Sequence, residues 1–169
     1  MMNKNEKALK SAVAEKQESK RQVAYNRRAR FEYEIMDTYD AGLELAGTEV
    51  KSIREGRLNL QDAFCRIEHN EAWIHNMHIS PYEQGNIFNV EPRRKRKLLL
   101  HRWQILELKA KTEQKGLTIV PLTVYFLRGF AKMEIALAKG KKLYDKRDSI
   151  AERDQQREQQ RQFVRGDER

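Results

Sequence analysis

The chain has 169 residues, 39% of them hydrophobic, which favours one domain with a modest core over two domains. Its 34 Lys and Arg residues outnumber its 25 Asp and Glu residues, and the resulting net charge of +9 favours a polyanionic partner: RNA, DNA or an acidic membrane surface. No apolar run approaches the roughly 20 residues that span a bilayer, and no signal-peptide block opens the chain, so we expect a soluble, cytoplasmic protein.

Residues 1–25 are predicted to form a flexible hydrophilic extension. They are rich in Lys, Glu, Gln and Ser, and so few aliphatic side chains cannot offset the entropy of ordering the segment. Three arginines then crowd into residues 26–30, directly before an apolar alternation that starts at Phe31. This charge run fits a solvated surface and a phosphate contact equally well.

Alternating apolar residues predict a strand at 31–36 and, after a connection, a second strand at 41–45. Gly47 interrupts that alternation and predicts a turn into a short helix. Thr48 is the expected cap of the helix, and Gly56 is placed to end it.

Two further strands, within 58–69 and 72–79, are predicted to form a hairpin, followed by a loop at 81–90. His75 and His78 are three residues apart on a strand, so they point to opposite faces and do not chelate one metal ion together.

Five consecutive cations at 93–97 precede three leucines. Like charges repel unless a counter-charge is near, and on a folded domain this favours a phosphate partner over a merely solvated surface. Residues 102–115 have helical spacing, and Gly116 is placed to end that helix. The stripe expected to pack consists of Trp103, Ile105, Leu106 and Ala110.

A second hairpin is predicted from strands at 117–126 and 130–138, with a bulge or a sheet edge at Pro121. Arg128 and Gly129 form its turn. These elements together predict a mainly β domain with flanking helices, whose core ends at about Ala138.

Beyond the core, residues 140–147 set four cations around Tyr144, a combination typical of RNA surfaces, where cations hold phosphates and an aromatic stacks on a base. Residues 148–169 are nearly free of aliphatic side chains. Four arginines recur there at every fourth residue and would form one cationic ridge on a helix. Such a helix has no apolar face to pack, so we expect a disordered tail that folds along an anionic groove.

No catalytic arrangement is evident. Cys65 is the single cysteine, which excludes an internal disulfide and a cysteine-based zinc site, and the chain contains no glycine-rich phosphate loop and no Gly-x-Ser-x-Gly motif. We therefore expect no enzymatic activity, no cofactor and no metal.

Several blocks occur in a specific order along the chain: 26–30, 47–52, 78–82, 92–93 with 96–101, 116–118 and 138–147. This ordered set resembles the SmpB (small protein B, SsrA-binding protein) family over roughly residues 26–153. The resemblance implies an OB-type closed antiparallel β-barrel with flanking helices. It divides the chain into an extension at 1–25, an RNA-binding barrel at 26–138 and a basic tail at 139–169 that folds in the ribosome.

The resemblance also implies the function. The family binds transfer-messenger RNA and carries it into the vacant decoding site of a stalled bacterial ribosome, where the incomplete protein is tagged and the ribosome is rescued, a process called trans-translation. The implied partners are transfer-messenger RNA and the small-subunit decoding centre and messenger channel of the ribosome. We expect a monomer that binds the RNA one to one.

Matched by position, the family's contacts to transfer-messenger RNA fall on Asn26, Asp40, Glu49, Lys51, Leu99 and His101. Neighbouring cations would add affinity: Arg27, Arg28, Arg30, Arg93, Arg94, Arg96 and Lys97. Acidic groups do not attract phosphate, so Asp40 and Glu49 would accept hydrogen bonds from base or ribose, or position a cation such as Lys51.

The C-terminal part has two implied roles. The residues matched to the decoding site are Lys141, Lys142, Tyr144, Asp145, Lys146 and Arg147. The residues of the tail in the messenger channel are Arg153, Arg157, Arg161 and Arg165. The chain departs from the family pattern before residue 26, where nothing aligns, and at 155–169, which is Gln-rich.

Two rival functions share some of these features. A general RNA chaperone or ribosomal protein would have the same charge, barrel and tails but would bind many RNAs with similar affinity. A nuclease or RNA-modifying enzyme would need a residue whose removal abolishes turnover while leaving binding intact.

Overall fold

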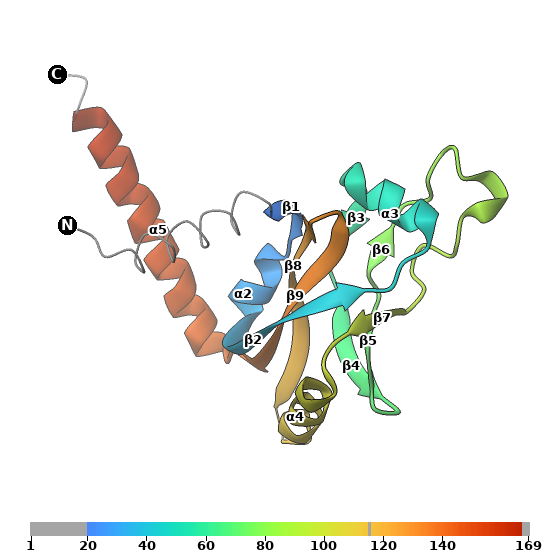
Figure 1. The fold of residues 1–169 in the computed structure, drawn as a ribbon. Coiled ribbons are helices and arrows are strands. Elements are labelled where there is room, and N and C mark those ends of the chain that lie inside the picture. The colour runs from blue at the N-terminus through green and yellow to red at the C-terminus, as the bar shows by residue number, and fades with distance from the viewer. Residues whose placement is uncertain (1–19, 115, 167–169) are drawn as a thin grey trace, which may run out of the picture.

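A computed structural model describes residues 20–114 and 116–166, with the backbone alone for 143–145 and 162–166. Residues 1–19 of the extension expected at 1–25 lie outside this part. The fold is mainly β with helices at its flanks (Figure 1). The strands are β1 (Lys20–Tyr25), β2 (Tyr33–Leu43), β3 (Leu58–Asn59), β4 (Phe64–Glu68), β5 (Glu71–His75), β6 (His78–Ile79), β7 (Arg96–Leu99), β8 (Leu117–Leu127) and β9 (Phe130–Gly140). The helices are α2 (Arg27–Glu32), α3 (Gly47–Arg54), α4 (Arg102–Thr112) and α5 (Leu143–Gly166), with a 3-10 turn η1 (Asn86–Phe88).

All the described strand pairs are antiparallel. The large sheet has the order β1-β8-β4-β5-β7-β2-β9, and β8 also pairs with β9, while β3 and β6 pair separately. The predicted hairpins β4–β5 and β8–β9 are both confirmed, the second turning through Arg128 and Gly129 at φ 50° and 82°. The strand register shifts at Pro121, which confirms the bulge. On the side of β8 away from β9, the pairing with β1 ends at Thr123 and the pairing with β4 is at Ile119, so Pro121 lies between the two.

Two buried clusters hold the domain together. The larger cluster lies on one face of β8 and β9, where side chains from other strands and from α3 and α4 join it. It includes Leu43, Ile53, Leu98, Leu108 and Ile135. The smaller one lies on the other face of β8 and β9, where Ala29 of α2 packs with Val120, Leu122, Ala136 and Ala138. Because Ala29 is small, α2 approaches the sheet closely, and the arginines beside it remain outside the core.

The structure corrects three expectations near the N-terminus. Residues 20–25, expected to belong to the extension, form β1 and pair with β8. The segment expected to start a strand at Phe31 is the end of α2. The strands expected at 31–36 and 41–45 are one continuous β2, because pairing with β9 extends through the expected connection between them.

Helix α3 and its ending at Gly56, which has φ 75°, are as predicted, but the expected cap at Thr48 is wrong. The first helical turn is closed by Glu49, whose Oε2 accepts from the Ala46 N–H at 2.9 Å, while the Thr48 hydroxyl donates to the Phe88 carbonyl at 3.2 Å. Helix α4 is also confirmed, but the residue that it buries fully is Leu108. Of the expected stripe, Ile105 is half-buried, while Trp103, Leu106 and Ala110 are exposed.

No helix in the described part of the chain combines the length and apolar character needed to cross a membrane.

Candidate nucleic-acid interface

Asn26 begins α2 and anchors it to the sheet. Its Oδ1 accepts from the Ala29 N–H at 3.1 Å, its Nδ2 donates to the Pro121 carbonyl at 3.1 Å, and its backbone N–H donates to the Leu122 carbonyl at 2.7 Å. Both polar atoms of the side chain are therefore engaged within the protein. The structure gives Asn26 the role of positioning the arginines that follow it.

Replacing Asn26 tests this role. Asn26→Ala removes the helix cap and the bond to Pro121, so we expect the free energy of unfolding to fall by about 1–2 kcal/mol in urea titration. Asn26→Ser is the matched control, since serine caps a helix but is too short to reach Pro121 and should recover part of the loss. An unchanged stability in Asn26→Ala would contradict the positioning role.

The three arginines of α2 are exposed but differ in their partners. Arg28 donates from Nε to Glu32 Oε1 at 2.7 Å and lies 3.2 Å from Asp62 Oδ1, and the hydrogen bond to Glu32 raises its pKa. No carboxylate pairs with Arg27 or Arg30 among the described residues. Arg27 and Arg30 are thus the cations of this helix that are free to meet phosphate.

Glu49, expected at the RNA, is instead the centre of a buried charge cluster. Arg94 donates to it from Nη2 at 2.6 Å and from Nε at 3.1 Å, and Arg96 donates from Nε at 2.7 Å. Arg96 is fully buried and also donates to the carbonyls of Met77, at 2.6 Å, and Pro92, at 3.0 Å. The structure therefore removes Arg96 from the set of cations available to RNA.

The cation that Glu49 positions is Arg94, and the expected partner Lys51 is not in the cluster. Burial by itself would raise the pKa of Glu49. The hydrogen bonds from Arg94, from the Ala46 N–H and from Arg96 outweigh burial and lower it, so Glu49 is held as a carboxylate.

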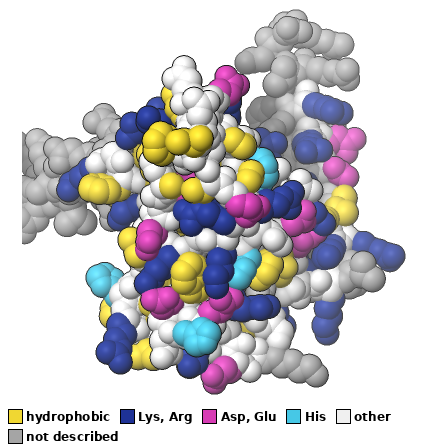
Figure 2. Space-filling model, turned by 90° about the vertical axis from the view of Figure 1, so that its right-hand side faces the viewer, with side chains coloured by type: hydrophobic (Ala, Val, Ile, Leu, Met, Phe, Trp, Pro, Cys, Tyr) yellow, Lys and Arg dark blue, Asp and Glu magenta, His cyan; other side chains and the backbone are white. Residues whose placement is uncertain are grey.

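Most of the basic run at 93–97 has its counter-charges inside the protein. Lys95 lies 3.0 Å from Glu68 and over the ring of Trp73, and Lys97 pairs with Glu71. Figure 2 shows the result on the face that carries β5 and β7, where basic and acidic side chains alternate. These ion pairs within the protein relieve the repulsion among the cations. The inference that this repulsion favours a phosphate partner is therefore corrected. In the described part of the chain, only the Arg93 side chain of the five forms no ion pair with a carboxylate.

The structure brings Asp40 and Leu99 to one outer face. Gly42 of β2 pairs with Leu99 of β7, and side chains two residues apart on a strand share a face, so Asp40, Gly42 and Leu99 point outward together. A Cβ on Gly42 would lie 3.2 Å from the Leu99 Cβ, so glycine lets the exposed leucine lie flat across β2. His101 follows at the start of α4, also exposed.

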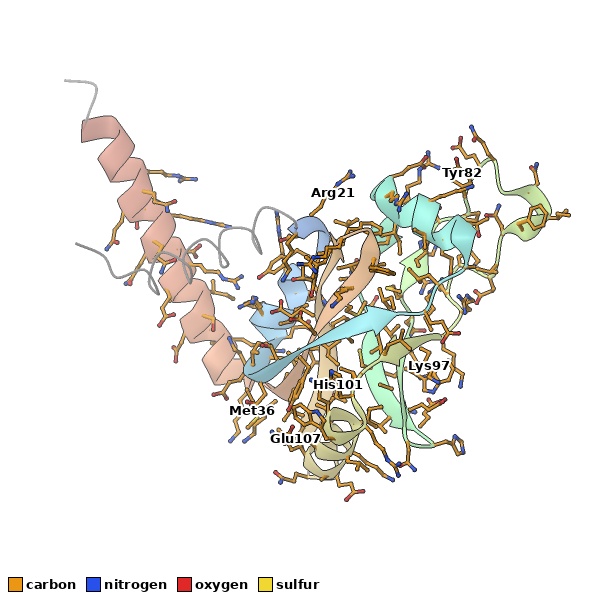
Figure 3. The ribbon with its side chains drawn as sticks, in the orientation of Figure 1. Arg21, Met36, Tyr82, Lys97, His101 and Glu107 are labelled. Carbon is orange, nitrogen blue, oxygen red and sulfur yellow. The ribbon has the colours of Figure 1, made fainter. Side chains whose placement is uncertain are left out.

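Two of the expected contacts have partners within the protein. Asp40 Oδ1 accepts from the Tyr125 hydroxyl at 2.6 Å, which leaves its second oxygen for an outside donor. Lys51 on α3 is exposed, with its Nζ 5.4 Å from the centre of the Tyr82 ring. Figure 3 places Tyr82 beside α3 and His101 beside α4, so the expected contacts are spread over the domain and do not converge on one pocket.

The expected decoding-site residues lie at the junction of β9 and α5. The Lys141 N–H donates to the Glu32 carbonyl at 2.9 Å, and its Nζ donates to Ser149 Oγ at 3.1 Å, which ties this junction to α2 and α5. Lys142 and Arg147 are exposed, and Lys146 is half-buried. The side chains of Tyr144 and Asp145 lie outside the described residues.

The C-terminal segment is one long helix, α5, of 24 residues. It is exposed from 151 to 161, so the predicted cationic ridge exists here with Arg153, Arg157 and Arg161, while the side chain of Arg165 lies outside the described part. The structure has this segment as a helix, and the expectation that the tail folds along an anionic groove stays a prediction. Arginines four residues apart on one helix repel one another, and this favours an anionic partner along the ridge.

Among the exposed aromatic side chains that sequence reasoning missed, two lie within two residues of expected RNA contacts. Tyr25, with 41% of its surface exposed, lies directly before the arginines of α2, and Trp103 is 62% exposed on α4. The position of Tyr25 directly before the basic segment could have indicated that its ring is exposed. No feature of the sequence indicated exposure of Trp103, because its helical spacing placed it on the apolar stripe that was expected to pack. In the part of the chain that the structure describes, no three His, Cys, Asp or Glu side chains gather in a group able to hold a metal ion.

These features define a class: a small, mainly β domain whose exposed arginines, aromatics and basic helix are those of an RNA-binding protein. The family model described as SmpB protein matches residues 23–165, and the chain belongs to the SmpB family.

Relatives support this membership. The SsrA-binding protein of Desulforudis audaxviator is 60% identical over 141 residues, covering 83% of this chain and 92% of the relative. That of Moorella thermoacetica is 61% identical over 137 residues, covering 80% and 88%. A solved structure described as "tmRNA-SmpB: a journey to the center of the bacterial ribosome" is 54% identical, with a TM-score of 0.61, and covers 71% of this chain and 85% of its own.

Proposed function

We propose that this chain binds transfer-messenger RNA and delivers it to the vacant decoding site of stalled ribosomes, so that the unfinished peptide is tagged and the ribosome is rescued. The observation that carries the proposal is 60% identity to an SsrA-binding protein over 92% of that protein's length. The chain acts as an adaptor between two RNAs in the cytoplasm and not as an enzyme.

The domain is the part that holds transfer-messenger RNA. The strand pairing runs from β8 through β4, β5, β7, β2 and β9 and returns to β8, which supports an OB-type closed barrel at 26–138, extended by the pairing of β1. The segment before β1 is the extension, and residues 139–169 are the tail.

The RNA contacts divide into direct and indirect ones. Exposure supports direct contact by Arg27, Arg30, Asp40, Lys51, Arg93, Leu99 and His101. Asn26, Glu49 and Arg96 act indirectly, since their polar atoms hold α2 and Arg94 in place. Lys141, Lys142, Tyr144, Asp145, Lys146 and Arg147 meet the decoding site, and the arginine ridge of α5 follows the empty messenger channel.

A titration against two RNAs tests the proposal. Binding of transfer-messenger RNA and of an ordinary elongator transfer RNA is measured at low and at near-physiological salt. Contacts to phosphate alone weaken steeply with salt for both RNAs, so we expect only transfer-messenger RNA to stay bound at the higher salt.

Release of both RNAs together would contradict delivery of one RNA and favour the general RNA binder. Reproducible cleavage of either RNA, lost on a single substitution, would favour the nuclease.

A further inference from the structure

A cleft between α2 and α5 gathers four arginines. Its lining consists of Tyr25, Arg27, Arg30, Arg153, Gln156, Arg157 and Gln160, around a volume of about 400 Å³. Figure 1 shows the two helices on the same side of the domain, with α5 rising beside α2. None of the described residues that line the cleft is acidic.

The two helices present like charges to one another. Arg27 and Arg30 are three residues apart on α2, and Arg153 and Arg157 are four apart on α5, spacings that place each pair on one helix face. Like charges at these spacings are destabilising, and facing pairs add to the repulsion. Within the described residues, no carboxylate forms an ion pair with any of the four.

The helices are nevertheless held together by other contacts. Lys141 donates from Nζ to Ser149 Oγ at 3.1 Å and lies 3.5 Å from the Arg30 carbonyl. The Arg153 guanidinium lies 5.4 Å from the centre of the Phe31 ring. The base of the cleft is thus fixed by the protein, while its charged walls lack an anion.

We propose that this cleft is a binding site for single-stranded RNA, in which the four arginines hold phosphodiester groups and Tyr25 stacks on a base. Guanidinium groups match phosphate geometry, and the half-exposed Tyr25 ring has the Arg30 guanidinium 5.8 Å from its centre. The site deepens the proposed function, because it rests on an RNA partner and joins domain and tail in one contact. Bound phosphate would hold α5 against α2.

The test uses the full chain with a uridine trinucleotide and, separately, with pyrophosphate, in the absence of ribosomes and transfer-messenger RNA. The variant Arg153→Gln with Arg157→Gln removes one wall of the cleft. The control, Arg66→Gln with Arg102→Gln, removes the same charge from two exposed positions outside the cleft that have no assigned RNA contact. Tyr25→Leu removes the ring and keeps its apolar bulk.

We expect the wall variant to weaken trinucleotide binding at least tenfold and to lower the salt slope by about 1.4, at roughly 0.7 for each lost contact on a single strand. The control should bind within about twofold of the wild type, because charges outside the cleft are screened. Tyr25→Leu should weaken the trinucleotide about tenfold and leave pyrophosphate unchanged. Hydrogen exchange of α5 amides should slow on binding in the wild type and not in the wall variant.

Equal losses in the wall and control variants would overturn the site, since α5 would then contribute only diffuse charge. Binding of pyrophosphate without the trinucleotide would overturn the assignment to RNA and indicate free phosphate. Either result leaves the proposed function standing, because discrimination between transfer-messenger RNA and transfer RNA is measured separately.

Discussion

Glu49→Gln is expected to lower the free energy of unfolding at neutral pH by about 3–5 kcal/mol, measured by urea titration. The substitution removes the anion between Arg94 and Arg96, and Arg96 is fully buried, so its charge would be left without its partner. The matched control is Glu71→Gln, which breaks a half-buried pair with Lys97 whose two side chains both remain in contact with water, and it should cost less than about 1 kcal/mol.

The pH dependence of this effect has a definite sign. Because the folded protein lowers the pKa of Glu49, its contribution to stability is complete above the unfolded pKa of about 4.3 and is lost as the pH falls through the lower folded value. The stabilities of wild type and Glu49→Gln should therefore converge in acid. Weaker RNA binding by Glu49→Gln with unchanged stability would contradict this role and indicate direct contact of Glu49 with RNA.

Removal of residues 148–169 is expected to leave binding of transfer-messenger RNA nearly intact and to abolish peptide tagging. The domain contacts remain after the deletion, among them Arg27, Leu99 and His101, while most of α5 and its arginine ridge are lost. RNA binding by gel shift and tagging in a reconstituted translation system measure the two effects separately.

The control for this deletion keeps the helix and its charge. Replacement of Arg153, Arg157 and Arg161 by lysine preserves the ridge and should retain most tagging, since a messenger channel lined by phosphates attracts either cation. If transfer-messenger RNA binding collapses on deletion, the tail belongs to the primary RNA site and the two steps are not separable.

Local signals in the sequence were sufficient for the elements that depend on near neighbours. The turn at Arg128 and Gly129, the end of α3 at Gly56 and the bulge at Pro121 follow from backbone preferences of the residues themselves. The packing of α4 was not predictable in this way. Trp103 and Leu108 have similar apolar character, and only the position of the helix against β4 and β8 decides which one is buried.

The same division applies to the charges. Arg96 lies two residues before the buried Leu98, so both side chains point to the same, inner face of β7. The alternation of the strand could therefore have predicted a buried Arg96, although the five consecutive cations suggested a solvated segment. The partner that makes a buried arginine tolerable is Glu49, 47 residues earlier on α3, and no local pattern connects the two.

The sequence by itself determined the family, the mainly β class and the excess of positive charge, because these follow from ordered motifs, periodicity and composition. Only the tertiary structure decided which cations remain available to RNA. Ion pairing depends on distance in space, and the fold brings Glu49, Glu68 and Glu71 to the basic run while it leaves Arg27 and Arg30 without a carboxylate among the described residues.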